Sequence, residues 1–327
     1  MAFGKFIISL DFELMWGVRD KRTIESYGTS ILGVRTALDL MLESFDKYDI
    51  KATFATVGFL FYENKRDLCK NIPDLLPTYS DSNLNPYINL DLFLGENEAK
   101  DPYHFGYSLV ENIKARKNHE IASHTYSHYY CLEPGQTVVQ FEEDLKLAKS
   151  VLHKNGIEMK SIVFPRNQYN DDYLNVCEKL GITSYRGNET SAIYRSSNGE
   201  GQTLLRRAIR MLDSYINITG YNCHVLEYVK DSSLYNIPSS RFLRPYSSKL
   251  FFLEHLKFLR IKNAMTHAAK NNLMYHLWWH PHNFGSNYNE NIRLLEKILK
   301  HYKVLNQKYG FQSITMQDLS NELKNLE

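Results

Sequence analysis

Two histidines separated by three residues, in the run His124-Thr125-Tyr126-Ser127-His128, are the clearest sign of chemistry in the sequence. Two imidazoles that share one metal ion need ring nitrogens about 3 Å apart, because metal–nitrogen bonds are about 2.1 Å long. An extended strand would separate the two residues by about 13 Å, whereas a coiled segment would let them converge. We therefore predict that the chain leaves a strand at His124 and coils. The alternative is one buried structural histidine and one surface histidine.

Two carboxylates, Asp11 and Glu13, follow an apolar run near the start of the chain. Residues two apart on a strand face the same side, about 6.6 Å apart along the chain. One carboxylate could then bind a metal ion while the other reaches a water molecule on it. A pair of exposed carboxylates at a strand end is the alternative.

Two further side chains follow apolar runs later in the sequence. Arg166 comes directly after one run and could hold a carboxylate through two parallel hydrogen bonds. His280 ends another, where a neutral imidazole could exchange protons near pH 7. His276 and His282 share the same face on strand periodicity, and packing roles are the alternative for all three histidines. A surface position is the alternative for Arg166.

Strand-like and helical patterns alternate along the chain, which predicts parallel strands joined by right-handed crossovers. The expected strands are Lys5–Leu10, Lys51–Val57, His119–Ser123, Ser161–Phe164, Thr183–Tyr185, Leu273–Trp279 and Phe311–Ile314. Helical apolar spacing lies between them, for example in Ile31–Tyr48. We predict an α/β fold, a distorted barrel of seven strands in one domain spanning 1–327. The irregular segment 61–104 is expected as an insertion after the second strand, over the active-site face. Each candidate cluster follows a strand, where barrel enzymes place their active sites.

Composition excludes several classes of protein. The formal net charge of +2 gives no support for a nucleic-acid polymer as partner. The four cysteines form no CxxC pair, which argues against a disulfide framework or a cysteine zinc site. The first ten residues lack the apolar core of a signal peptide, and no apolar stretch is long enough for a membrane span. We therefore expect a cytoplasmic protein.

Taken in order, the clusters resemble the polysaccharide deacetylases of carbohydrate esterase family four, also known by NodB homology. The metal motif of that family, H-[ST]-x-x-[HD], is matched in full by His124 to His128. Its second strand commonly resembles ATFFVxG, and Ala52–Gly58 spells ATFATVG. Its paired aspartates resemble Asp11 and Glu13, although Phe12 intervenes here. The chain is thus similar to an outlying member of the family.

The resemblance implies a divalent metal ion, zinc first with cobalt or nickel as alternatives, and a set of site residues. The implied metal ligands are Glu13, His124 and His128, and the implied catalytic residues are Asp11, Arg166 and His280. Asp11 would act as the base, Arg166 would hold Asp11, and His280 would protonate the leaving nitrogen. The metal ion, with a backbone amide near Tyr129 or Tyr130, would stabilise the oxyanion. The interruption by Phe12 leaves a swap of the two acidic roles open.

The implied reaction removes an N-acyl group, N-acetyl first, from an amino sugar in surface-polysaccharide biosynthesis. Trp16, Trp279 and Tyr129 are candidate substrate contacts, with burial in the core as the alternative. Trp278 is a further candidate, for which the pattern favours burial in the core. Arginines 206, 207, 210, 241 and 244 could hold the phosphate of a nucleotide- or lipid-linked sugar, and a solvated surface is the alternative. A deformylase or cyclic-amide hydrolase could use the same site. A non-catalytic carbohydrate-binding protein on a decayed barrel is the alternative from another class.

Overall fold

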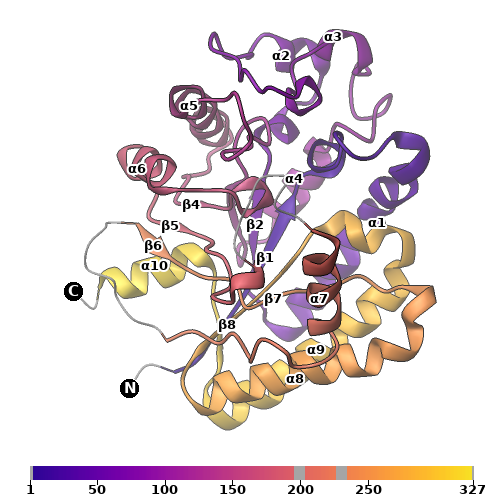
Figure 1. Ribbon diagram of the computed structural model, residues 1–327, viewed down its shortest axis with the longest axis vertical. Helices are drawn as coiled ribbons and strands as arrows, with labels where there is room; N and C mark the ends of the chain where they lie inside the picture. Colours follow the sequence, from indigo (N-terminus) through magenta and orange to yellow (C-terminus); the bar gives the residue numbers. More distant parts are fainter. Residues whose placement is uncertain (1–2, 195–202, 226–233, 326–327) are drawn as a thin grey trace.

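The structure, a computed structural model, describes residues 3–194, 203–225 and 234–325. Within these ranges nine strands form one sheet in the order β6-β5-β4-β3-β2-β1-β8-β7, and β9 pairs with β1 (Figure 1). The strands are β1 Lys5–Phe12, β2 Thr53–Thr56, β3 Glu120–Ser123, β4 Ser161–Ile162, β5 Ser184–Tyr185, β6 Tyr235–Asn236, β7 Arg241–Phe242, β8 Met274–Trp279 and β9 Gln312–Ser313. Every pairing between these strands is parallel, so the predicted α/β class is confirmed.

The sheet curves into a half-barrel whose last gap is crossed by irregular chain. The segment between β6 and β7 runs from the β5 side to the β8 side: the Ser239 amide donates to the Gly187 carbonyl, and the Ser240 amide donates to the His276 carbonyl. The predicted count of seven strands is too low, because β6 and β7 are absent from the expected set. Each has only two residues, too few to show the alternation that marks a strand in sequence.

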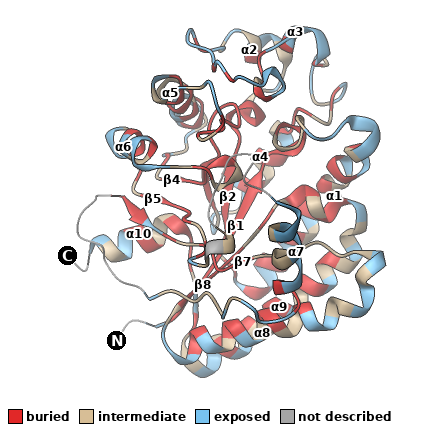
Figure 2. Ribbon diagram, viewed as in Figure 1, coloured by how far each residue is buried: buried red, intermediate tan, exposed pale blue. Residues whose placement is uncertain are grey.

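Helices surround the sheet on its outer side, as Figure 1 shows. They are α1 Ile24–Tyr48, α2 Lys65–Cys69, α3 Leu90–Phe93, α4 Tyr107–Lys114, α5 Val138–Lys154, α6 Asp171–Lys179, α7 Leu204–Asp213, α8 Glu254–Lys270, α9 Tyr288–Tyr309 and α10 Met316–Lys324. Their buried faces turn toward the strands and their exposed faces toward solvent (Figure 2). In the described part of the chain, none of these helices has the length and apolar character needed to cross a membrane.

Capping chemistry sets where α1 begins. The periodic apolar pattern predicts a start at Ile31, but the helix begins at Ile24. The Thr23 hydroxyl accepts from the Ser26 amide, and the Ser26 hydroxyl accepts from the Thr23 amide, so two otherwise unpaired donors are satisfied. The first turn therefore forms without a strong apolar stripe.

Alternation along β1 separates the core of the molecule from its site. Phe6, Ile8, Leu10 and Phe12 pack with the surrounding helices, whereas Ile7 packs inside the curved sheet. Side chains on a strand alternate between its faces, so Ser9 and Asp11 point to the same interior as Ile7. The interior is thus apolar low in the sheet and becomes polar toward the carboxyl ends of the strands.

Strand β8 pairs with β1 and runs parallel to it. Met274 belongs to the interior cluster, and its neighbour Tyr275 belongs to the helix-side core. His276 and Trp278 therefore share the interior with Met274, while Trp279 faces the helices. The two strands thus bring polar side chains to the same edge of the sheet.

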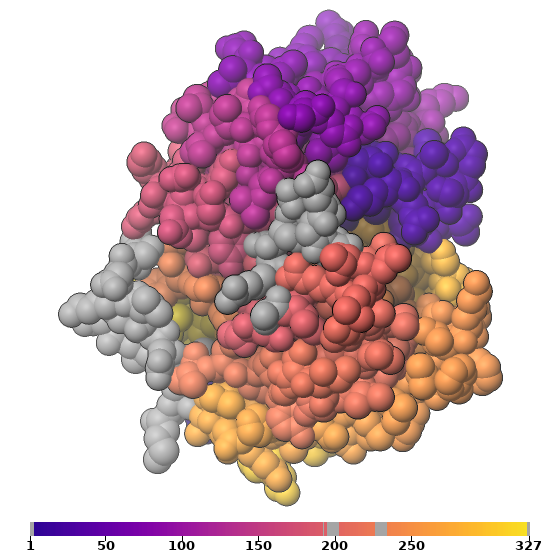
Figure 3. Space-filling model, viewed as in Figure 1, coloured from indigo at the N-terminus to yellow at the C-terminus, as the bar shows by residue number. Residues whose placement is uncertain are grey.

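The segment 61–104 contains α2, α3 and a turn of 3-10 helix at Ser82–Leu84, and it lies at the top of Figure 1. It packs on the loops that follow β1 and β3. The Tyr126 hydroxyl donates to the Asn71 carbonyl at 2.8 Å, and the Trp16 indole donates to the His104 carbonyl at 2.8 Å. In Figure 3 the surface of the N-terminal half of the chain, coloured from indigo to magenta, lies above the orange and yellow C-terminal helices.

Candidate metal centre and active site

Glu13, His124 and His128 meet at the carboxyl ends of β1 and β3. One carboxylate oxygen of Glu13, Oε2, lies 3.1 Å from Nε2 of His124 and 2.9 Å from Nε2 of His128. Potential ligand atoms of the three residues all lie within 4.8 Å of one another, and all three side chains are buried. This set of one carboxylate and two imidazoles is a donor set that divalent zinc prefers.

The hydrogen bonding of His124 tests whether a cation fits these atoms. Its Nδ1 donates to the Val163 carbonyl at 2.7 Å, so a neutral ring presents the lone pair of Nε2 to the Glu13 carboxylate. Burial lowers the pKa of His128 to about 4, so its ring is also neutral near pH 7. A lone pair facing a carboxylate oxygen is stabilised by a cation between them, and the arrangement therefore fits a divalent ion.

Glu13 is ionised in this setting. Burial raises the pKa of its carboxyl group, but the nearby rings of His280, His128 and His124 lower it more, and the net pKa is well below the usual value. A buried carboxylate needs positive charge or donors around it, and a cation held between Glu13 and the two neutral imidazoles would meet that need.

The loop from His124 to His128 coils as the spacing predicts. β3 ends at Ser123, and both Thr125 (φ 63°) and His128 (φ 60°) adopt left-handed backbone conformations. The two imidazole ring centres lie 5.0 Å apart. The predicted departure from the strand at His124 is therefore confirmed, although the segment is a tight loop with left-handed residues rather than a helical turn.

Asp144, on α5, holds this loop from behind. Its carboxylate accepts from the Tyr126 amide at 2.7 Å, from the Ser127 amide at 3.1 Å and from the Ser127 hydroxyl. Burial raises the pKa of Asp144 to about 6, although these donors lower it. Sequence reasoning missed this residue because nothing in the helical pattern of α5 distinguishes a buried acid from a surface one.

Asp11 is paired with Arg186, which follows β5. The two guanidinium nitrogens bind the two carboxylate oxygens at 2.6 and 2.8 Å, and Arg186 also donates to Ser9 and Asn167. Arg186 is fully buried, and its guanidinium lies 4.2 Å from the centre of the Trp278 ring. Burial raises the pKa of Asp11, but Arg186 together with His124 and His280 outweighs burial and the net pKa is lowered, so Asp11 is ionised.

The prediction that Arg166 holds Asp11 is wrong. Arg166 donates to Asp20 and, at 2.8 Å, to Glu133, and it stacks 4.0 Å from the centre of the Tyr130 ring. Its backbone has a left-handed conformation (φ 55°), which aims the side chain toward the loop after β1. The sequence feature that identifies the partner of Asp11 lies one strand later, where Arg186 directly follows β5.

His280 stands across from both acids. Its Nε2 lies 3.6 Å from Asp11 Oδ2 and 3.6 Å from Glu13 Oε1. Its Nδ1 accepts from Asn283 at 3.2 Å, and the Tyr27 hydroxyl donates to the Asn283 oxygen at 2.8 Å. This chain of contacts places a proton on Nε2, toward the acids. The side chain is 24% exposed, so a ligand can reach it.

The two neighbouring histidines differ from His280 in burial. His276 donates to or accepts from the Ser9 hydroxyl at 2.8 Å inside the sheet, and burial lowers its pKa to about 3. His282 is also buried, with its Nε2 3.9 Å from Glu13 Oε1 and its pKa lowered to about 3 by burial. Both are neutral near pH 7, and His282 adds a further imidazole beside Glu13 that sequence periodicity could not separate from its neighbours.

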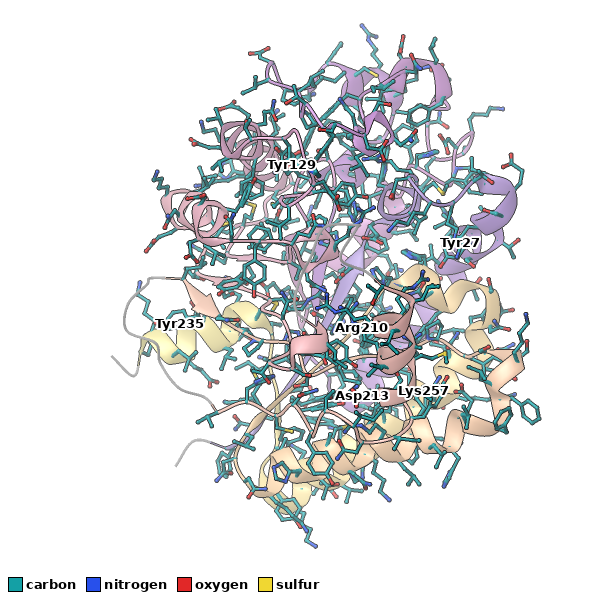
Figure 4. All side chains as sticks on the ribbon, in the orientation of Figure 1. Tyr27, Tyr129, Arg210, Asp213, Tyr235 and Lys257 are labelled. Carbon is teal, nitrogen blue, oxygen red and sulfur yellow. The ribbon has the colours of Figure 1, made fainter. Side chains whose placement is uncertain are left out.

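The three predicted substrate contacts are wrong, because all three side chains are buried. Trp16 packs edge-on against Phe59, and Trp279 stacks on Phe284 in the helix-side core. Tyr129 is 1% exposed and donates to Gln136 at 2.9 Å (Figure 4). Trp278, which faces the interior, is the tryptophan that lines the cavity next to His280.

The backbone amides of Tyr129 and Tyr130 were also candidates to bind a developing oxyanion. The Tyr129 amide donates to the Thr125 hydroxyl at 2.7 Å, and the Tyr130 amide donates to the Tyr79 hydroxyl at 2.8 Å. Both donors are therefore engaged within the protein, and this expectation is wrong.

Comparison with known proteins gives the same family as the motifs. The family model described as polysaccharide deacetylase matches residues 32–185, a range that includes His124 and His128 and ends before His280. The match covers somewhat less than half of the chain and agrees with the expected resemblance to polysaccharide deacetylases, which is confirmed. No curated protein matches the sequence significantly.

Solved structures share the fold at low sequence identity. A protein from Mycobacterium smegmatis described as a polysaccharide deacetylase has a TM-score of 0.61 at 12% identity, covering 99% of this chain and 91% of that one. A protein from Pseudomonas aeruginosa, also described as a polysaccharide deacetylase, has a TM-score of 0.55 at 10% identity, covering 98% of this chain and 90% of that one. The PuuE allantoinase has 0.54 at 11%, covering 98% and 89%. These likenesses confirm the barrel-like α/β fold.

Proposed function

We propose that the protein is a metal-dependent hydrolase that removes an N-acyl group, N-acetyl first, from an amino sugar. The observation that carries the proposal is the meeting of Glu13, His124 and His128 with the ion-paired Asp11 and the accessible His280. A divalent ion, zinc first with cobalt or nickel as alternatives, would polarise the acyl oxygen and activate water when held by Glu13, His124 and His128.

Asp11 is the base in this proposal. Arg186 fixes both of its oxygens, so the carboxylate cannot rotate away, and its lowered pKa keeps it ionised. It therefore accepts a proton from the attacking water. Arg186 acts through Asp11 and is a positioning residue.

His280 is the acid. An amide nitrogen leaves only when it is protonated, and His280 carries a proton on the nitrogen that faces the acids. Asn283 and Tyr27 fix the ring so that this nitrogen points at the reacting atoms. Because Asp11 must be ionised and His280 protonated, the dependence of rate on pH is bell-shaped.

The match of residues 32–185 to the polysaccharide deacetylase model supports an amide bond in an acetylated saccharide as the substrate. We place the reaction in surface-polysaccharide biosynthesis. A deformylase, a cyclic-amide hydrolase and a non-catalytic carbohydrate-binding protein are the competing functions, and each predicts a different outcome with a small set of ligands.

The experiment measures acetate release from N-acetylglucosamine oligosaccharides by zinc-loaded protein, with N-formyl sugars and allantoin in parallel. The proposal expects acetate as the main product and a loss of about 100-fold or more in turnover for His280→Ala with unchanged metal content. His267→Ala, on the outer end of α8, is the matched control and should behave as wild type. Faster release from the formyl sugar or from allantoin would replace the proposal with the corresponding alternative. Sugar binding without any product would support the non-catalytic protein.

A further inference from the structure

A cavity of about 240 Å³ opens beside His280 and is unusually rich in arginine. Four guanidinium side chains line it: Arg166, Arg210, Arg241 and Arg244. Its volume is below the roughly 300–1,000 Å³ of pockets for drug-sized ligands, so it suits one substituent of a larger substrate. Because His280 belongs both to this wall and to the candidate active site, a substrate can occupy the two together.

Arg241 supplies a hydrogen-bond donor that contacts within the protein hold in the cavity wall. The residue is 3% exposed, and one of its terminal nitrogens, Nη1, binds Asp213 on α7 and, at 3.1 Å, the Tyr194 hydroxyl. Its other terminal nitrogen, Nη2, is buried and has no hydrogen-bond partner among the described residues. A buried donor without an acceptor is costly, and an acceptor brought by a ligand would remove that cost.

Arg244 brings charge that no nearby acid balances. Its Nε donates to the Ser214 hydroxyl at 2.8 Å, and within the described ranges no carboxylate lies within 4 Å of its guanidinium. Burial lowers its pKa, and Arg207 and Arg241 lower it further, so the group stays charged at a cost in free energy. Arg210 and Asp213, labelled in Figure 4, lie on α7 beside it.

Glu189 is the carboxyl group in the wall, and it does not offset these cations at neutral pH. Its side chain is 4% exposed, and burial raises its pKa to about 8 although Arg241 lowers it. Asn222 donates to its Oε2 at 3.3 Å. In its protonated form Glu189 is a neutral donor and adds to the donors that face the cavity.

An aromatic part of the wall leads toward the site. Phe242 and Trp278 pack with ring centres 4.7 Å apart, and His280 lies 5.7 Å from Trp278. The buried Trp278 Nε1 has no partner among the described residues. A sugar ring can pack on this surface between an anionic substituent and the reacting amide.

We infer that this cavity binds a phosphate group carried by the N-acylated sugar, so that the substrate class is a phosphorylated amino sugar. The inference rests on the proposed function. A phosphate carries up to two negative charges and three acceptor oxygens, and arginine binds it through paired hydrogen bonds. The free nitrogen of Arg241 and the unbalanced Arg244 match a phosphate better than a neutral hydroxyl group.

The test compares kcat/KM for N-acetylglucosamine 1-phosphate and for neutral N-acetylglucosamine, in wild type and in Arg244→Gln. The inference expects wild type to prefer the phosphorylated sugar and the ratio of the two values to fall about 10- to 100-fold in the variant. Arg293→Gln removes the same charge from the exposed face of α9 and should leave the ratio unchanged. UDP-N-acetylglucosamine as a third substrate separates a sugar phosphate from a nucleotide-linked sugar.

A calorimetric titration of the zinc-loaded protein with inorganic phosphate separates the two levels of the proposal. If phosphate binding weakens at least 10-fold in Arg244→Gln and no sugar is hydrolysed, the result would support the phosphate site and contradict the proposed hydrolase function. Hydrolysis of neutral and phosphorylated sugars at equal rates, with phosphate binding unchanged in Arg244→Gln, would overturn the inference and leave the hydrolase intact.

Discussion

Replacing Arg186 with methionine should destabilise the protein and disturb its chemistry together. Two charge-assisted hydrogen bonds of 2.6 and 2.8 Å are lost, and each contributes about 1.5–3 kcal/mol. The variant leaves Asp11 buried without its cation, which costs about 3–5 kcal/mol in the free energy of unfolding. Urea unfolding of wild type and Arg186→Met measures this loss directly.

The same substitution changes the pKa of Asp11 in a defined direction. Burial raises that pKa and Arg186 lowers it, so removal of Arg186 leaves burial dominant and the pKa rises. The acid side of the pH–rate profile should therefore move to higher pH in Arg186→Met. Arg166→Met should leave that side unmoved, because Arg166 binds Asp20 and Glu133 instead. Unchanged stability and an unchanged profile in Arg186→Met, with a shift in Arg166→Met, would refute the reasoning.

Three further predictions concern residues around the site. Asp144→Asn should lower the free energy of unfolding by about 1–3 kcal/mol, because an amide nitrogen would face a donor of the metal loop. It should also weaken zinc binding about 10- to 100-fold in a chelator titration. A variant with the stability and zinc affinity of wild type would contradict this prediction. The pKa of His276 is lowered to about 3, so the folded state resists protonation that the unfolded chain accepts below pH 6.5. The free energy of unfolding should fall by about 1.6 kcal/mol through this residue from pH 6.5 to 5, and His276→Gln should flatten that slope in urea titrations. An unaltered slope would count against this prediction. Trp279→Ala should cost about 3–5 kcal/mol with KM within about twofold of wild type, and a large rise in KM would show that the residue contacts substrate.

The sequence predicted the position of the candidate site better than it predicted which side chains contact one another there. Strand-end positions placed Asp11, Glu13, His124, His128 and His280 at one edge of the sheet, because parallel strands bring their carboxyl ends together. The coil after β3 followed from metal-bond geometry alone. These inferences depend on local spacing and on sheet topology, both of which the sequence carries.

The wrong predictions concern contacts between residues that lie far apart in the sequence. The partner of Asp11 depends on which strand-end arginine crosses the barrel interior, and the left-handed backbone of Arg166 turns that side chain away. The choice between Trp278 and Trp279 depends on which face of β8 is the interior, which follows only from pairing with β1. The short strands β6 and β7 exist because neighbouring backbones offer hydrogen bonds, not because of their own residues.

The central claim is a divalent metal ion held by Glu13, His124 and His128, and metal content tests it most directly. Wild type and Glu13→Gln would be loaded with zinc, freed of excess ion and analysed by elemental mass spectrometry. The account predicts about one ion per chain in wild type and loss of that ion in the variant, which keeps the shape of Glu13 and removes its charge. Wild type that retains no zinc, cobalt or nickel after loading, or a variant that retains as much as wild type, would contradict it.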